Sequence, residues 1–157
     1  MSFYILMNLF LTLAWAAFLG SFSPQNLLVG YLLGYIVLFL SRHALPQSKY
    51  FEKVPKGIGF MLFFIWELLI ASLRVAIDVL SIKHHMRPRV IAYKMNARTQ
   101  AEIVLLSNLL TLTPGSLSLD VSSDHTVLYV HAIYAEDEEK AINGLQRLEN
   151  KLLDLLR

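Results

Sequence analysis

Three ionisable side chains stand out because they interrupt a long apolar stretch. Glu67, Arg74 and Asp78 lie within a mostly apolar segment that runs from residue 57 to about residue 82. In a helix they share one narrow face with Ser81, and Arg74 and Asp78 are spaced to form an ion pair. Ionisable groups at membrane depth are costly and often mark ion paths or contacts between subunits. We favour structural pairing for these residues, with partner contact and a direct role in proton transfer as the alternatives.

The remaining sequence offers little that is typical of a catalytic or metal site. His84 and His85 are adjacent, so their side chains point apart in a helix or strand, and solvated basic surface explains them best. His125 and His131 have aspartates and serines nearby, but no nucleophile elbow or glycine-rich phosphate loop accompanies them. The chain contains no cysteine for a disulfide, a thiolate site or a nucleophile. We therefore expect no catalytic residue, no metal site and no cofactor.

The elements that position these side chains are predicted to be membrane helices. Apolar residues make up 55% of the chain and charged residues 17%, against about 25% charged in soluble domains. No charged residue precedes Arg42, and a helix of that length reaches about 60 Å, enough for two membrane crossings. A turn signal at residues 20–26 divides this stretch into predicted helices at 3–19 and 24–41. A secretory signal peptide is the weaker alternative, since neither a basic start nor a cleavage site is clear.

A small-residue motif marks one face of the second predicted helix. Gly30 and Gly34 form a GxxxG pattern, which lets another helix approach closely. Glycine is also frequent in membrane helices, so a chance occurrence is the alternative. The sequence predicts helix packing or partner contact at these glycines without deciding between the two interpretations.

The distribution of Lys and Arg predicts which helices cross the membrane. The loop between the first two helices has none, whereas four lie in the connector at 42–56 and five lie from Lys83 to Arg98. Because basic residues favour the cytoplasm, three crossings would leave one basic cluster outside. A hairpin followed by a helix at 57–82 on the cytoplasmic surface places both clusters inside, although the narrow polar stripe favours a third crossing. We prefer the peripheral helix and expect Lys83 to Arg98 to contact anionic lipid.

The last third of the sequence predicts a small α+β domain. Its predicted elements follow the order strand, helix, strand, strand, helix, at residues 89–95, 97–111, 117–122, 126–133 and 136–157. This order predicts a small mixed sheet with helices on one face. About 70 residues are marginal alone, so we expect support from the membrane, the third helix or a partner. The chain is thus predicted to divide into a membrane region at 1–82 and a cytoplasmic domain at 83–157.

A turn motif joins the first helix of this domain to its second strand. Pro114 ends the helix and Gly115 permits the tight turn after Thr113, so backbone geometry is the preferred interpretation. A docking corner for a neighbouring subunit is the alternative. The strand after the turn alternates, which predicts Ser118, Asp120 and Ser122 on one face, towards solvent or a partner.

This part of the sequence resembles a known family. Residues 107–121 (SNLLTLTPGSLSLDV) and 128–131 (LYVH) are similar to the E subunit of the multisubunit Mrp cation/proton antiporters of bacteria, also called Mnh or Sha. The layout and length of the whole chain agree with that family. The resemblance implies a sodium/proton antiporter complex of the plasma membrane, in which large subunits hold the ion paths and the small E subunit assists assembly or stability. Such exchange supports pH homeostasis and salt tolerance.

The residues alone indicate a membrane-anchored, non-catalytic domain without its own ion path. Two hypotheses follow: an accessory subunit of a transporter, and a free-standing membrane-tethered adaptor whose α+β domain recruits a soluble partner. The glycine motif and the polar stripe favour the first hypothesis, because both seek other membrane helices. Expected partners are the other hydrophobic antiporter subunits and membrane lipid. A net charge of +2 is too small to indicate nucleic acid.

Overall fold

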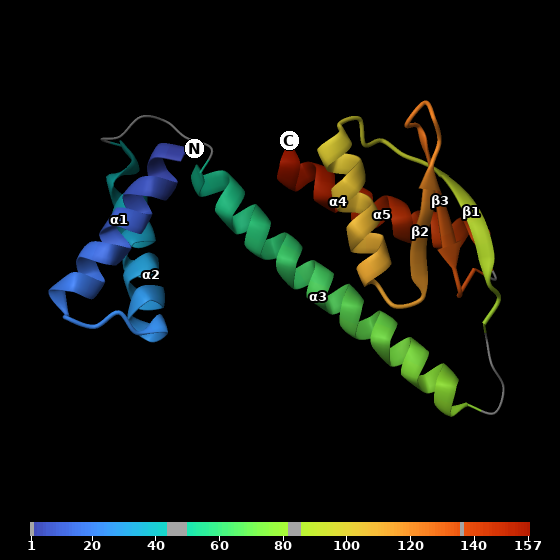
Figure 1. Cartoon of the computed structure of the whole chain (residues 1–157), viewed down its shortest axis with the longest axis horizontal. Coiled ribbons are helices and arrows are strands. Elements are labelled where there is room, and N and C mark those ends of the chain that lie inside the picture. The colour runs from blue at the N-terminus through green and yellow to red at the C-terminus, as the bar shows by residue number, and fades with distance from the viewer. Residues whose placement is uncertain (1, 44–49, 82–85, 136) are drawn as a thin grey trace. The chain divides into compact units, whose positions relative to one another are not determined.

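The computed structural model describes residues 2–43, 50–81, 86–135 and 137–157. The chain forms two compact units, Met1–Pro55 and Lys56–Arg157, which are described separately (Figure 1). Several predictions concern residues outside the described ranges, namely Lys49, Ile82, Lys83, His84, His85 and Glu136.

The first unit is a helical hairpin followed by the start of a third helix. Helix α1 (Ser2–Phe18) packs along α2 (Pro24–Leu40), and a short 3-10 helix, η1 (Ser41–His43), follows. The Ser23 side chain caps α2 by accepting a hydrogen bond from the backbone N–H of Asn26 at 3.3 Å. The bounds of both helices lie within two residues of the predicted ranges, as expected when a charge-free stretch is divided by one strong turn signal.

Helix α3 (Tyr50–Leu80) has 31 residues and begins before the predicted start at residue 57. The prediction placed Pro55 in the connector, but this proline lies inside the helix. Pro55 is the sixth residue of the helix, so it removes the backbone hydrogen bond that an N–H there would make to the carbonyl of Phe51. Within the described residues, α3 is the one helix long and apolar enough to cross a membrane by length and composition.

The second unit contains a three-stranded sheet. Its elements are β1 (Arg89–Lys94), α4 (Gln100–Leu112), β2 (Ser116–Val121), β3 (Val127–Ala132) and α5 (Glu138–Leu156). The strand order is β1-β3-β2 and both pairs are antiparallel, so the predicted mixed sheet is wrong. The reason is that β1 pairs with β3 rather than with β2, and β3 runs against both of its neighbours.

The core of the second unit joins the sheet to three helices. Ile91 and Tyr93 of β1 and Leu128 and Val130 of β3 are buried on the same face of the sheet. Helix α4 packs against β2, and α5 contacts β1 and α4. Phe64 of α3 belongs to this same core cluster. Helix α3 from Lys56 onward is therefore part of the compact unit that contains the sheet, whereas the division into membrane and cytoplasmic regions stays a prediction.

Candidate functional site

The polar face of α3 lies against the sheet-containing unit. The Glu67 carboxylate is 3.6 Å from the Arg147 guanidinium of α5, which itself lies 5.2 Å from the ring centroid of Phe63. The Arg74 guanidinium lies 5.7 Å from the ring centroid of Tyr134. Asp78 is buried, with 3% of its surface exposed. The three ionisable residues that the sequence singled out therefore share the helix face that packs on the domain.

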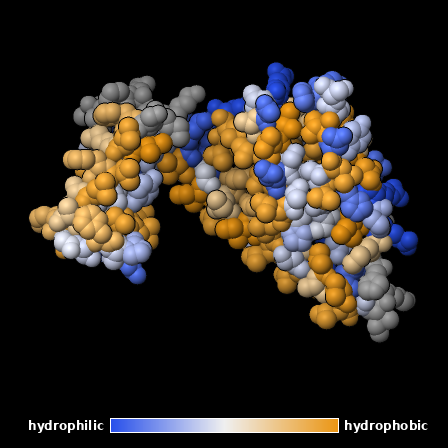
Figure 2. Space-filling model, viewed as in Figure 1, coloured by the Kyte–Doolittle hydropathy of each residue, from blue (hydrophilic) through white to orange (hydrophobic). Residues whose placement is uncertain are grey.

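The opposite side of α3 is apolar and exposed. Its exposed large side chains recur along the helix from Ile58 to Leu80: Ile58, Met61, Leu62, Ile65, Trp66, Leu69, Ile70, Leu73, Ile77, Val79 and Leu80. Figure 2 shows hydrophobic surface along this helix, whereas the rest of the unit on the visible face mixes hydrophilic and hydrophobic surface. An apolar stripe of this length on a helix whose other face is already packed is typical of contact with lipid or with another apolar surface.

The predicted turn motif forms the corner between α4 and β2. Thr113 ends α4, and its hydroxyl donates to the Leu109 carbonyl at 2.9 Å. The Ser116 hydroxyl donates to the Leu110 carbonyl at 2.7 Å, which satisfies another carbonyl at the helix end. Gly115 has φ +93°, a conformation that other residues rarely adopt. Thr113, Pro114 and Gly115 thus supply the backbone geometry that the turn requires.

Gly115 also makes room for an aromatic side chain. A Cβ at this position would lie 3.2 Å from Cδ2 of Tyr134. The Tyr134 hydroxyl is buried and has no hydrogen-bond partner among the described residues. Burial raises the pKa of the Tyr134 phenol, and the charge of Asp78 raises it further, while Arg74 lowers it. The corner therefore fixes a tyrosine whose polar end faces the charged stripe of α3.

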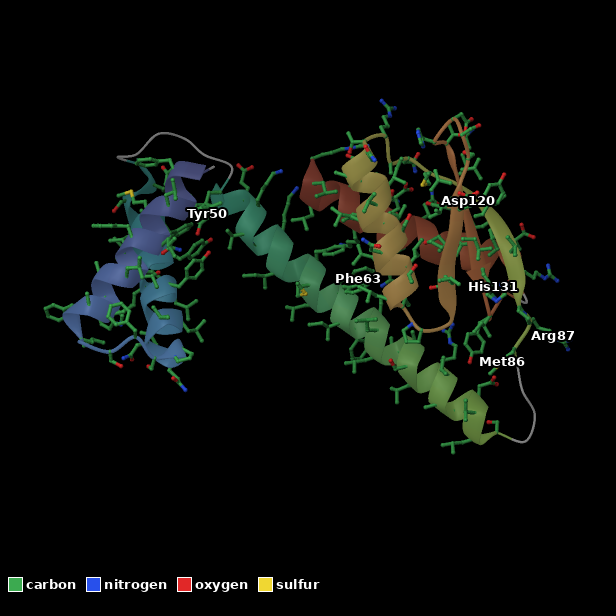
Figure 3. The ribbon with its side chains drawn as sticks, in the orientation of Figure 1. Tyr50, Phe63, Met86, Arg87, Asp120 and His131 are labelled. Atoms are coloured by element: carbon green, nitrogen blue, oxygen red, sulfur yellow. The ribbon has the colours of Figure 1, made fainter. Side chains whose placement is uncertain are left out.

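A cleft brings these features together. It has a volume of about 640 Å³ and lies between α3, the α4–β2 corner and α5, with Glu67, Arg74, Tyr134 and Lys140 in its lining. A smaller groove of about 420 Å³ adjoins it, lined by Ile70, Leu73, Arg74, Ile77, Asp78 and Tyr134. The side chains in Figure 3 show Phe63 on the side of α3 that faces the sheet-containing unit. Glu67, Arg74 and the turn residues, which lie far apart in sequence, thus line one cleft.

The faces of β2 differ from the prediction. The Ser118 hydroxyl donates to the Ser107 carbonyl of α4 at 3.0 Å, so this serine points towards the helix. A register shift between Ser118 and Asp120 puts Asp120 opposite Tyr129, on the other face of the sheet. Leu117 and Leu119 are exposed. The prediction of Ser118, Asp120 and Ser122 on a single face is therefore wrong, because strict alternation does not hold across a β-bulge.

The two motif glycines of α2 face α1 of the same chain. A Cβ on Gly30 would lie 3.0 Å from the Trp15 ring and 3.2 Å from the Thr12 carbonyl oxygen, and a Cβ on Gly34 would run into the Asn8 side chain. The Asn8 amide donates to the Tyr50 hydroxyl at 3.1 Å, and the hydroxyls of Tyr50 and Tyr31 are 3.4 Å apart. The glycines thus allow the hairpin to close around a small polar cluster.

Two carboxylates that the sequence analysis did not single out organise the domain. Glu149 is fully buried and accepts hydrogen bonds from the Tyr93 hydroxyl at 2.7 Å and the Ala97 N–H at 2.9 Å. Glu149 also accepts from the backbone N–H of Asn96 at 2.7 Å and from its side-chain amide at 3.2 Å. Burial and then the contact with Glu149 raise the pKa of the Tyr93 phenol. No local pattern marks Glu149, because its partners come from a distant part of the chain.

The second carboxylate, Glu102, belongs to a motif that can be recognised in the sequence. Thr99 and Glu102 form a capping box at the start of α4, with the separation of three residues that is typical of that motif. The Glu102 carboxylate also pairs with Arg157 at 3.2 Å. Arg157 and two backbone N–H groups lower the pKa of Glu102 to about 2. Within the described ranges, no three His, Asp or Glu residues gather as a metal site would require.

Comparison with known proteins shows the class of protein to which this chain is similar. A family described as "Na+/H+ ion antiporter subunit" matches residues 8–155. The E subunit of the Na(+)/H(+) antiporter of Bacillus subtilis (strain 168) is 42% identical, covering 98% of this chain and 97% of the relative. The E subunit from Alkalihalophilus pseudofirmus (strain OF4) is 34% identical over the full length of both. A chain in the "Structure of Mrp complex from Dietzia sp. DQ12-45-1b" is 29% identical with a TM-score of 0.51, covering 64% of this chain and 94% of that one.

These relatives are components of a membrane transporter rather than enzymes. The chain belongs to the family formed by the E subunits of Na+/H+ antiporters, as the resemblance in residues 107–121 and 128–131 predicted. It is therefore a bacterial membrane protein of an Mrp-type antiporter.

Proposed function

We propose that the chain is an accessory subunit that helps to assemble and stabilise a multisubunit sodium/proton antiporter, and thereby supports cation efflux and pH homeostasis. The observation that carries this proposal is the match along nearly the whole chain to proteins named as E subunits of such antiporters. The other hydrophobic subunits of such a complex are the proposed partners.

We further propose that the chain holds no ion path of its own. A proton relay across a membrane needs a series of titratable groups. The helices α1 and α2 carry no charged residue. The polar groups Asn8, Tyr31 and Tyr50 bond to one another, and the Thr12 hydroxyl donates to the Asn8 carbonyl at 2.8 Å. Such mutual pairing supports a structural role in closing the hairpin.

For the membrane arrangement we propose that α1 and α2 cross the bilayer and that α3 lies on the cytoplasmic surface. The two faces of α3 support this: one packs on the sheet-containing unit through Phe60, Phe64 and Glu67, and the other exposes apolar side chains. A helix that spanned the bilayer would carry the packed domain face into the hydrocarbon. The basic residues from Lys83 to Arg98 then lie beside anionic lipid headgroups on the same side.

Deleting the gene for this subunit while keeping the other antiporter subunits tests the assembly role. The proposal predicts that the large complex on native gels decreases, that exchange activity in membrane vesicles falls with it, and that the full-length chain restores both. A complete complex that forms in normal amounts without this chain would contradict the proposal.

Single cysteines test the membrane arrangement, because the chain has no native cysteine. Gln25 at the hairpin loop and Lys151 on α5 are both exposed and are suitable positions. A membrane-impermeant thiol reagent added to intact cells is expected to label Gln25→Cys and not Lys151→Cys, whereas permeabilised cells expose both. Labelling of Lys151→Cys in intact cells would mean that α3 crosses the membrane.

A further inference from the structure

The groove beside the second half of α3 combines an apolar wall with a polar end. Ile70, Leu73 and Ile77 form the apolar wall, and Arg74 and Tyr134 stand at the polar end. Leu73 and Ile77 are each more than half exposed and also belong to the apolar stripe of α3. The groove is therefore continuous with the surface that we place against the bilayer.

The polar end of this groove has a cation and a hydroxyl that lack polar partners among the described residues. Arg74 forms no ion pair with another described residue. Its guanidinium instead lies over the Tyr134 ring, 5.7 Å from the ring centroid. The Tyr134 hydroxyl is buried and makes no hydrogen bond within the described ranges. An arginine at the boundary of an apolar face, next to a phenol that can donate, is suited to a phosphate group.

Two carboxylates in the lining of the cleft are paired with cations other than Arg74. Glu67 is paired with Arg147 at 3.6 Å, and Asp137 with Lys140 at 3.2 Å. Asp78 lines the same groove and its charge acts on the Tyr134 phenol, but the Asp78 side chain is buried whereas Arg74 is exposed. Among the described residues that line the groove, Arg74 is thus the cation available to bind an anion at its mouth.

We infer that this groove binds the phosphate headgroup of an anionic phospholipid, with Arg74 and Tyr134 at the phosphate and an acyl chain along Leu73 and Ile77. The inference rests on the proposed placement of α3 at the membrane surface. It goes beyond general attraction of the basic segment to lipid, because it assigns one lipid to a defined groove. Gly115 then acts as a positioning residue, since it accommodates the Tyr134 ring.

Native mass spectrometry of the delipidated full chain in mild detergent tests the groove directly. Dioleoyl phosphatidylglycerol is expected to bind more tightly than dioleoyl phosphatidylcholine. Loss of one charge-assisted contact in Arg74→Gln should weaken phosphatidylglycerol binding about tenfold. Lys151→Gln also removes one positive charge, on α5, outside both the groove and the basic segment, and should leave binding unchanged. Equal losses in both variants, or no preference for phosphatidylglycerol, would overturn the inference.

A second variant and a second measurement keep the outcomes separable. Tyr134→Phe removes only the hydroxyl and is expected to weaken phosphatidylglycerol binding about threefold; unchanged binding in a folded Tyr134→Phe chain contradicts the inference. In a Trp15→Phe background, quenching of Trp66 by brominated lipid in nanodiscs reports whether α3 meets the bilayer. Quenching together with unaffected lipid binding in Arg74→Gln refutes the groove but not the placement of α3. Absence of quenching refutes both.

Discussion

Gly34 of α2 sits against Asn8 of α1, so replacing it with alanine should weaken the hairpin. The added Cβ would run into the Asn8 side chain, whose amide donates to the Tyr50 hydroxyl. Overpacking of this kind costs about 1–3 kcal/mol. Displacing Asn8 loses a hydrogen bond worth about 1 kcal/mol, and alanine returns about 1 kcal/mol of helix propensity. We expect a net loss of about 1–3 kcal/mol in the free energy of unfolding.

Gly59 of α3 supplies the matched control. From the described residues, no atom outside its own helix lies within 4 Å of a Cβ built there, and its φ is not positive. Gly59→Ala should therefore leave stability unchanged or raise it by up to about 1 kcal/mol. Unfolding is followed by titrating the full chain in dodecylmaltoside with sodium dodecyl sulfate. Trp15, which lies against Gly30, reports on the hairpin once Trp66 is replaced by phenylalanine.

A double-mutant cycle tests the stated cause. Asn8→Ala removes the side-chain atoms nearest to the new methyl group and leaves the contact with Leu11 Cβ at 3.3 Å, so Gly34→Ala should cost clearly less in that background than in the wild-type chain. If Gly34→Ala behaves like Gly59→Ala, or if its cost is the same with and without Asn8, the packing argument is refuted.

Three further changes test the domain. The buried Glu149 carboxylate accepts hydrogen bonds from several donors, and Glu149→Gln replaces one of its oxygens with an amide group that is itself a donor. This change should lower the free energy of unfolding, measured by denaturant titration, by about 2–4 kcal/mol. A loss below about 1 kcal/mol would contradict the structural role of Glu149. Because the folded pKa of Glu102 is lowered from 4.5 to about 2, its contribution is complete above pH 4.5 and is lost as the pH falls towards 2. Arg157→Gln should weaken that acid dependence, and an unaltered pH profile would count against the pair. Glu67→Gln removes a partly exposed ion pair with Arg147 and should change stability by less than about 1 kcal/mol while exchange activity persists; complete loss of exchange in a fully assembled complex would indicate a direct role in transport.

The elements with a strong local signal could be predicted from the sequence. A charge-free stretch with one turn signal predicts the hairpin of α1 and α2, and the Pro-Gly corner after α4 predicts where β2 begins. The predicted start of α3 is too late because a proline normally indicates a helix boundary, whereas Pro55 lies inside this helix as its sixth residue. The sheet was predicted as mixed because strand order cannot be derived from the order of elements along the chain.

The candidate site was predictable only in part, since it depends on contacts between distant segments. The shared face of Glu67, Arg74 and Asp78 follows from helical periodicity. That this face packs on the domain, with Tyr134 opposite, depends on how the sheet closes against α3. Glu149 gives no local signal for the same reason. The faces of β2 were misassigned because a single bulged residue reverses the alternation.

Native co-purification tests most directly whether this chain is a component of a larger antiporter. The chain carries a C-terminal tag on a flexible linker, the membranes are extracted in mild detergent, and the co-purified proteins are identified by mass spectrometry. We predict a stoichiometric set of very hydrophobic antiporter subunits. Recovery of the chain alone, or with a soluble partner only, would contradict the accessory-subunit function and support a membrane-tethered adaptor instead.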